Sequence, residues 1–196
     1  MDFLARLAIR IDTINEWVGR GVSWVTTLMV AVVFVDVVMR YLFATSFVFT
    51  QELEWHLFGF IFLIGAGYTL LHDGHVRVDI IYQKLSPKAQ AWINLVGCTL
   101  FMLPGCLLII YTSISFVADA IYVVNQTPQA GHSAITFVWE GSPDPGGIPL
   151  RFLLKACIPV GFVLFLMQGA SLFIKSLFIV RGLEAPGLDV DGKGAH

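Results

Sequence analysis

The segment "VVMRYLFATSFVFTQELEWHLFGFIFLIGAG", residues 37–67, joins two long apolar stretches through a short turn. It is apolar almost throughout, yet it contains Arg40, Glu52, Glu54 and His56. A charged side chain is costly in hydrocarbon unless it finds a partner or reaches the interface. The segment therefore predicts two antiparallel membrane helices whose charged residues meet at one membrane surface.

The composition of the whole chain is also that of a membrane protein. Of its 196 residues, 57% are hydrophobic and 13% are charged, against roughly half and a quarter in soluble domains. A hydrocarbon core takes about 20 helical residues to cross, and lipid offers no hydrogen-bond partner to an open backbone. We therefore expect an all-α membrane protein with four transmembrane helices. The expected spans are residues 22–43, 53–71, 91–117 and 152–180.

We expect these spans to form a single domain over residues 1–182. Residues 118–150 form a long loop on one side of the membrane, and the Gly-rich residues 183–196 form a disordered tail. The first span is retained, because its apolar run is about twice the length of a signal-peptide core. The lack of two inverted repeats argues against a transporter that is complete in this chain.

Two amphipathic segments accompany the spans. Residues 1–17 and 78–92 each place apolar side chains on one helical face, and the second is interrupted at Pro87. We expect both to be helices that lie on the membrane surface. The third apolar stretch is longer than a bilayer requires, and Pro104 predicts a kink within it.

The basic residues indicate the orientation, because cytoplasmic loops of membrane proteins carry an excess of Lys and Arg. Nine of the 12 fall on one side, namely Arg6, Arg10, Arg20, Arg77, Lys84, Lys88, Lys175, Arg181 and Lys193. The other side has Arg40, Arg151 and Lys155. Both termini and the middle loop are therefore expected in the cytoplasm. The basic residues flank spans and form no soluble patch, so nucleic acid is not an expected partner.

The charges of the opening segment are expected at the outer boundary. Arg20 and Arg40 are 20 residues apart, which is about 30 Å of helix, one bilayer thickness. Glu52 and Glu54 begin the next helix at the depth of Arg40, and Asp36 lies one turn deeper on the face of Arg40. We expect Arg40 to pair with Glu52 or Glu54. The alternative is that Arg40 reaches the interface alone and the acids are merely interfacial.

The long outer loop is a candidate docking surface. It carries three acidic residues, Asp119, Glu140 and Asp144, together with a turn-forming Ser-Pro-Asp-Pro-Gly-Gly run. The chain has no phosphate-binding glycine loop and no nucleophile placed beside a base, so we expect no enzyme and no catalytic residue.

The histidines and cysteines do not predict a metal or a cofactor. His72 and His75 are three residues apart around a glycine, which is typical of a turn cap as much as of a metal site. A haem would need axial histidines on facing helices, whereas His56 and His72 share one expected helix. The three cysteines have neither metal-ligand nor disulfide spacing, and we expect them to be small packing residues within spans. They are Cys98, Cys106 and Cys157.

Several motifs, in this order and spacing, resemble the DctQ-like small membrane subunit of TRAP (tripartite ATP-independent periplasmic) transporters. They are "RYLF" at residues 40–43, "QELEW" at 51–55 and "GAGYTLLHDGHVRVDII" at 65–81. The resemblance implies a bacterial inner-membrane protein that works with a large sodium-coupled elevator subunit and a periplasmic substrate-binding protein. This chain would then be a fixed, non-conducting scaffold, surrounded by membrane lipid, whose outer face helps to dock the binding protein.

The segment "WEGSPDPGGIPLRFLLKACIPVGFVLFLMQG" at residues 139–169 resembles the branch of the family associated with 2-oxo acids, lactate and similar carboxylates. Two other classes stay open at this point. One is a membrane anchor of a redox complex, which the missing haem histidines disfavour. The other is a four-helix adaptor of an unrelated membrane complex. Co-purification of the partner would distinguish them.

Overall fold

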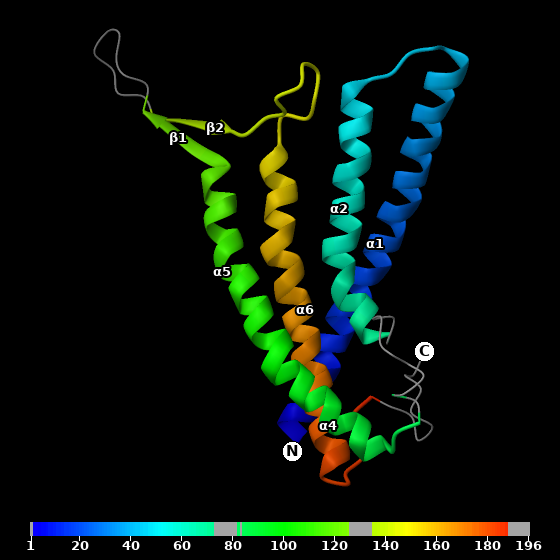
Figure 1. Ribbon diagram of the computed structural model, residues 1–196, viewed down its shortest axis with the longest axis vertical. Coiled ribbons are helices and arrows are strands. Elements are labelled where there is room, and N and C mark those ends of the chain that lie inside the picture. The colour runs from blue at the N-terminus through cyan, green and yellow to red at the C-terminus, as the bar shows by residue number, and fades with distance from the viewer. Residues whose placement is uncertain (1, 73–81, 83, 126–134, 188–196) are drawn as a thin grey trace.

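The computed structural model contains four long helices (Figure 1). It describes residues 2–72, 82, 84–125 and 135–187. Each of the four helices is long and apolar enough to cross a membrane, which confirms the expected helical membrane fold. In chain order they are α1 (Asp2–Leu42), α2 (Val48–Leu71), a third helix composed of α4 (Pro87–Gly97), a π-helical turn (Cys98–Met102) and α5 (Leu103–Asp119), and α6 (Arg151–Val180).

A small antiparallel sheet, which the sequence did not predict, follows α5. Strand β1 (Ile121–Asn125) pairs with β2 (Ile135–Trp139), with Ile121 opposite Trp139. The hairpin projects from the same end of the bundle as the turn between α1 and α2 (Figure 1). We call this the hairpin end, formed by residues 43–47, the two strands and residues 140–150. The opposite end, where α1 and α4 begin and α2 and α6 end, is called the terminal end.

Helix α1 differs from the expected surface helix followed by a span. It is one continuous helix of 41 residues, about 60 Å long and twice a hydrocarbon core. The reason is that its buried stripe does not stop before the span. Every third or fourth residue of the first half is buried, namely Ala8, Ile11, Asn15, Gly19 and Val22. Ala8 and Ile11 of the expected apolar face therefore pack within the bundle, whereas Phe3, Leu7 and Ile14 stay exposed.

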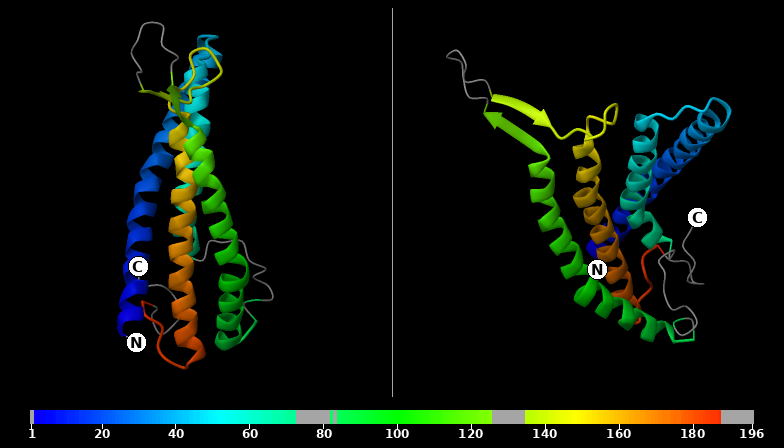
Figure 2. Two further views of the ribbon diagram at one scale, coloured as in Figure 1. Left: turned by 90° about the vertical axis from the view of Figure 1, so that its left-hand side faces the viewer. Right: turned by 45° about the horizontal axis from the view of Figure 1, so that its top comes forward.

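The third helix begins at the predicted interruption and bends at the predicted proline. Ser86 caps it, accepting a hydrogen bond from the Ala89 amide, and Pro87 occupies its first turn. Residues 87–92 thus belong to α4, while most of residues 78–86 lie outside the described part. Pro104 has no amide hydrogen and its ring clashes with the carbonyl four residues earlier, inside the π-helical turn. Figure 2 shows the resulting change of direction between α4 and α5.

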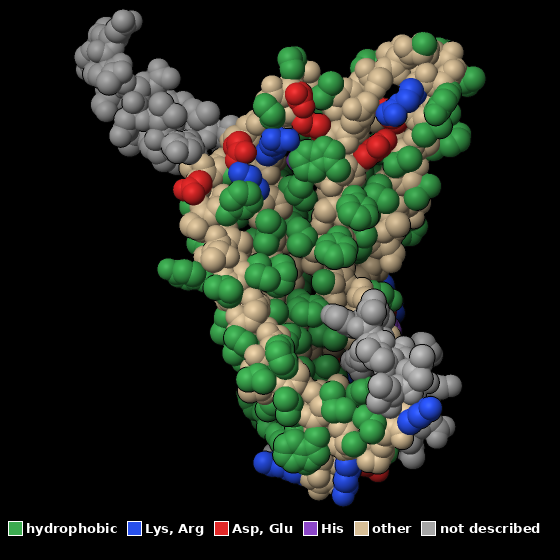
Figure 3. Space-filling view, in the orientation of Figure 1, with side chains coloured by type: hydrophobic (Ala, Val, Ile, Leu, Met, Phe, Trp, Pro, Cys, Tyr) green, Lys and Arg blue, Asp and Glu red, His purple; other side chains and the backbone are tan. Residues whose placement is uncertain are grey.

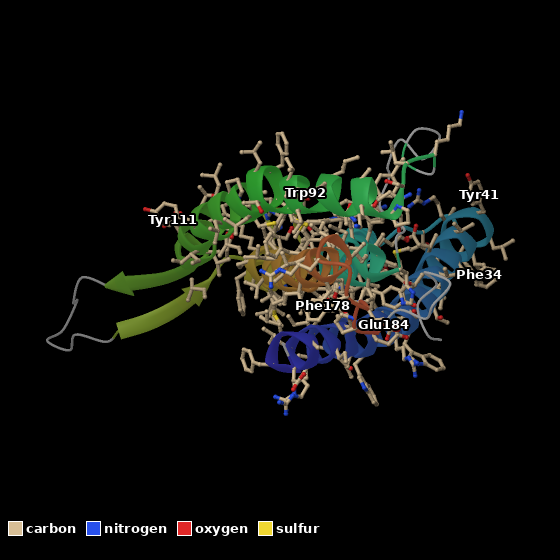
Figure 4. The ribbon with its side chains drawn as sticks, turned by 90° about the horizontal axis from the view of Figure 1, so that it is seen from below. Phe34, Tyr41, Trp92, Tyr111, Phe178 and Glu184 are labelled. Carbon is tan, nitrogen blue, oxygen red and sulfur yellow. The ribbon has the colours of Figure 1, made fainter. Side chains whose placement is uncertain are left out.

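Helix α6 lies at the centre of the bundle. It contacts α1, α2, α4 and α5, and it runs between α1 and α5 in the left view of Figure 2. Its buried residues include small and polar ones such as Ser171 as well as the large apolar Ile174 and Phe178. Figure 4 shows Phe178 within the bundle, whereas four labelled aromatic residues lie on its periphery. These exposed aromatics are Phe34, Tyr41, Trp92 and Tyr111. The exposed apolar surface suits a lipid environment.

Glycines allow α2 to approach both of its neighbours closely. A side chain at Gly67 would collide with the Asn15 amide of α1, and one at Gly161 would collide with the backbone of Leu63. Small residues at such contacts let membrane helices pack backbone to backbone. The close contacts of α2 with α1 and with α6 therefore fix the distances between these helices.

Candidate functional site

Glu52, in the second turn of α2, organises the loop that enters α6. Its side chain is only 6% exposed. The Ser142 hydroxyl donates to Oε1, the Ile148 amide donates to Oε2 at 2.6 Å, and the Arg151 guanidinium lies 3.7 Å from Oε1. Carboxylates that accept several such bonds are among the stronger polar contacts in proteins. Glu52 therefore joins the start of α2 to the start of α6.

The loop that Glu52 holds is a compact turn. The Ser142 amide donates to the Ile148 carbonyl at 3.0 Å, and the Gly147 amide donates to the Asp144 carbonyl at 3.0 Å. Gly146 has a φ of +84°, a backbone conformation that glycine adopts freely. A side chain at position 147 would collide with Ser142 and Glu52. The Ser-Pro-Asp-Pro-Gly-Gly run thus forms the predicted turn and fits against one carboxylate.

A second link joins the hairpin to the first turns of α6. Lys155 forms an ion pair with Glu140 and lies 4.2 Å from the centre of the Phe116 ring. The Arg151 guanidinium lies 5.4 Å from the ring of Trp55. Lys155 is only 20% exposed. Water therefore hydrates its ammonium group poorly, and the Glu140 carboxylate and the Phe116 ring stabilise the positive charge instead. The sequence predicts both cations on this side of the membrane but does not identify their partners.

Arg40 has a different partner from the one expected. Its guanidinium lies 2.5 Å from the carboxylate of Asp36, one turn earlier on α1, and not beside Glu52 or Glu54. Asp36 is 4% exposed and needs a counter-charge, which a residue one turn away supplies without any helix rearrangement. Glu52 is occupied by the loop. Oxygen Oε1 of Glu54 is buried and has no hydrogen-bond partner among the described residues.

The three acidic residues expected to form a docking surface all lie at the hairpin end, in different surroundings. Glu140 is bound by Lys155. Asp119 ends α5 and is exposed, and Asp144 is exposed at the tip of the turn. Unpaired buried polar atoms also gather here, at Nε2 of His56 and Nε of Arg151. The hairpin end thus presents two exposed carboxylates, and it also contains buried polar atoms that have no hydrogen-bond partner among the described residues.

A polar network at the terminal end, which sequence analysis missed, joins α1 to α6. Asp12 accepts from Gln168 at 2.9 Å and from Ser171 at 2.6 Å, and it pairs with Lys175 at 2.7 Å. Asn15, which is fully buried, donates to Gln168 at 2.9 Å. The sequence contains a pattern that could have indicated this network. Gln168, Ser171 and Lys175 of α6 follow one another at intervals of three and four residues, which places them on one helical face.

The residues considered for a metal site are arranged otherwise. His72 caps the C-terminus of α2, and its ring lies 2.8 Å from Glu16, which also pairs with Arg20. His75 lies outside the described residues. Within the described part, no three metal-binding side chains come together. Cys98 and Cys106 are buried in the third helix, and Cys157 is partly buried in α6.

Four apolar helices with charged residues at both ends define a multi-pass membrane protein. The family model for the DctQ component of tripartite ATP-independent periplasmic transporters matches residues 29–178. The chain therefore belongs to this family, which is a component of a transporter and not an enzyme. The match extends from the middle of α1 to the last turn of α6, and it includes Glu52 and the loop bound to it.

A protein of Haemophilus influenzae that bears the name of a TRAP transporter small permease protein is 34% identical over 86 residues. The match covers 44% of this chain and 53% of that protein. The chain therefore aligns with about half the length of this curated relative. No solved structure matches the chain significantly.

Proposed function

We propose that the chain is the small, non-conducting scaffold subunit of a sodium-coupled TRAP transporter that takes up organic acids. The observation that supports this role is that the middle of every described helix lacks charged residues. An ion path needs polar ligands near the middle of the bilayer, on helices that are interrupted there. The stretches without Asp, Glu, Lys or Arg are residues 21–35, 57–71, 89–118 and 156–174.

The scaffold is oriented with its terminal end in the cytoplasm and its hairpin end in the periplasm, in the bacterial inner membrane. The excess of Lys and Arg at the terminal end supports this orientation. A labelling experiment tests it, with single cysteines at Ser46 and Lys88 in a background without the three native cysteines. A membrane-impermeant reagent should label position 46 from the periplasm and leave position 88 unmodified. The reverse pattern would overturn the orientation.

The hairpin end receives the periplasmic substrate-binding protein. Support comes from exposed Asp119 and Asp144 and from the turn that Glu52 holds against the bundle. A preformed surface binds with a smaller entropic cost than a loop that must order on contact. The resemblance of residues 139–169 to the branch for 2-oxo acids and lactate supports small carboxylates as the substrate class.

The partner that co-purifies with the chain tests this assignment. The tagged chain is extracted from its own membranes in mild detergent, alongside an unrelated tagged four-helix membrane protein as the control. We expect a much larger multi-span membrane protein to accompany the chain and to be absent from the control. A flavin or iron–sulfur subunit in its place would contradict the assignment and favour the anchor of a redox complex.

A further inference from the structure

The cations at the two ends of the bundle differ in their partners. At the hairpin end Arg40, Arg151 and Lys155 each lie beside a carboxylate of this chain. Among the described residues of the terminal end, five cations have no carboxylate partner. They are Arg6, Arg10, Lys84, Lys88 and Arg181. Figure 3 shows the same contrast, with red and blue side chains together at the upper end and mostly blue ones at the lower end.

Two of these cations share a hollow on α1. Phe3, Arg6, Leu7 and Arg10 line a hollow of about 150 Å³. Their spacing of three and four residues places them on one helical face. The opposite face, with Ala8, packs against Ile174 and Phe178 of α6. The hollow therefore opens away from the bundle. Figure 4 shows the first turns of α1 at the edge of the bundle.

Arg6 and Arg10 have hydrogen-bond donors without an acceptor among the described residues. Arg6 donates through Nε to the Asp2 carbonyl at 3.2 Å, and its terminal amino groups make no further hydrogen bond to described residues. Arg10 makes none. A guanidinium presents its donors in a planar fork that matches two oxygens of a phosphate group. Two such forks, one turn apart on a helix, can bind one phosphate together.

The apolar half of the hollow identifies the source of that phosphate. The side chain of Phe3 is 72% exposed, and Leu7 is 37% exposed on the same face. A free phosphate would use only the arginines, whereas the phosphate of a phospholipid is joined to apolar groups that can contact Phe3 and Leu7 beside the arginines. We propose that this hollow binds one anionic phospholipid, with its headgroup phosphate between Arg6 and Arg10. This holds whichever leaflet the terminal end faces.

The site is tested with the full-length chain in mild detergent by native mass spectrometry. The chain is titrated with phosphatidylglycerol and with phosphatidylcholine of the same acyl length. We expect a bound phosphatidylglycerol molecule to be preferred. Because a basic residue near an anionic surface contributes about 1 kcal/mol, the Arg6→Gln, Arg10→Gln double variant should bind phosphatidylglycerol roughly 10- to 30-fold more weakly.

The matched control is the Lys84→Gln, Lys88→Gln variant, which removes the same charge from the same end without touching the hollow. Its affinity should stay close to that of the unmodified chain. Arg6→Lys with Arg10→Lys keeps the charge and loses the planar forks, and should give an intermediate loss. This lysine variant tests the site if the glutamine variant does not fold. Equal losses in the glutamine and control variants would overturn the proposal, because the binding would then be general surface attraction.

Inorganic phosphate distinguishes the two sources of the ligand. Phosphate in excess over the lipid should not displace phosphatidylglycerol, and Phe3→Ala with Leu7→Ala should weaken lipid binding although both arginines remain. Displacement by phosphate, together with unchanged lipid binding in the Phe3 and Leu7 variant, would show an anion site and contradict a lipid site.

Discussion

The two ends of this bundle are held together in different ways. At the terminal end, Asp12 and Asn15 of α1 bond directly to Gln168, Ser171 and Lys175 of α6, between buried helix faces. At the hairpin end, the bonds from Glu52 and Lys155 run to loop residues. At the terminal end these bonds join one helix to another, whereas at the hairpin end they hold a loop against the ends of the helices.

The ends also differ in how completely they satisfy their polar groups. Buried atoms without a described hydrogen-bond partner occur at the hairpin end in Glu54, His56 and Arg151, and at the terminal end in Asn15. Buried polar groups are normally paired, so an accumulation of unpaired ones at one end calls for an explanation. On the proposed function, the assembled complex supplies those partners. Substitutions at the two ends should therefore differ in their effects as their contacts do.

The largest effect is expected at the terminal end. Asp12→Asn leaves Lys175, whose side chain is 12% exposed, without a counter-charge in a buried site. Removing one member of such a pair costs about 3 kcal/mol, and we expect unfolding in mixed detergent micelles to become easier by that amount. Asp12→Asn combined with Lys175→Met should recover most of the loss.

Glu16→Gln is the control for this variant. It breaks contacts of the same helix to Arg20 and His72, which are 72% and 44% exposed, and should cost under about 1 kcal/mol. If both variants cost the same, the terminal network is not a helix-to-helix lock.

The second effect concerns the loop at the hairpin end. Glu52→Gln replaces one acceptor oxygen with an NH₂ group, so the Ser142 hydroxyl and the Ile148 amide cannot both keep their carboxylate acceptor. We expect roughly tenfold faster hydrogen exchange at the Ile148 amide, because a weakened local contact opens more often, while the helices stay protected. Glu54→Gln, two residues away, should leave that amide unchanged. Equal acceleration in both variants would contradict the assigned role of Glu52.

The smallest effect is expected at Arg40, which is 48% exposed in its pair with Asp36. Arg40→Gln should cost about 1 kcal/mol, because the arginine is half exposed and glutamine can still donate a hydrogen bond to the buried Asp36 one turn away. In double-mutant cycles Arg40 should couple to Asp36 and be additive with Glu52 and Glu54 within about 0.5 kcal/mol. Coupling to either glutamate instead would restore the pairing that the sequence suggested.

The parts of the fold that follow from local chemistry could be predicted. The helices, the capped start at Pro87 and the bend at Pro104 depend on apolar length and on proline geometry, which are properties of short segments. The continuity of α1 could not be predicted, because the same amphipathic face suits a membrane surface and a neighbouring helix equally. Only the packing of Ala8 against Ile174 and Phe178 distinguishes the two.

Only the placement of the candidate residues at one end of the bundle was predictable. Placing Arg40 and the glutamates at the same end needed no more than the rise of a helix. Their partners could not be deduced, since Glu52 binds Ser142 and Ile148 across a separation of 90 residues or more. The local alternative, Asp36 one turn from Arg40, was visible in the sequence and is the one that the structure adopts.

The central claim is that this chain supports transport without conducting. The direct measurement is sodium-driven uptake of a radiolabelled 2-oxo acid into proteoliposomes, in the presence of the substrate-binding protein. The chain is reconstituted alone, together with the large subunit that co-purifies with it, and in that same complex with Glu52→Gln. We predict no uptake by the chain alone, uptake by the complex, and reduced uptake by the variant complex. Sodium-driven uptake by the chain alone would contradict the account.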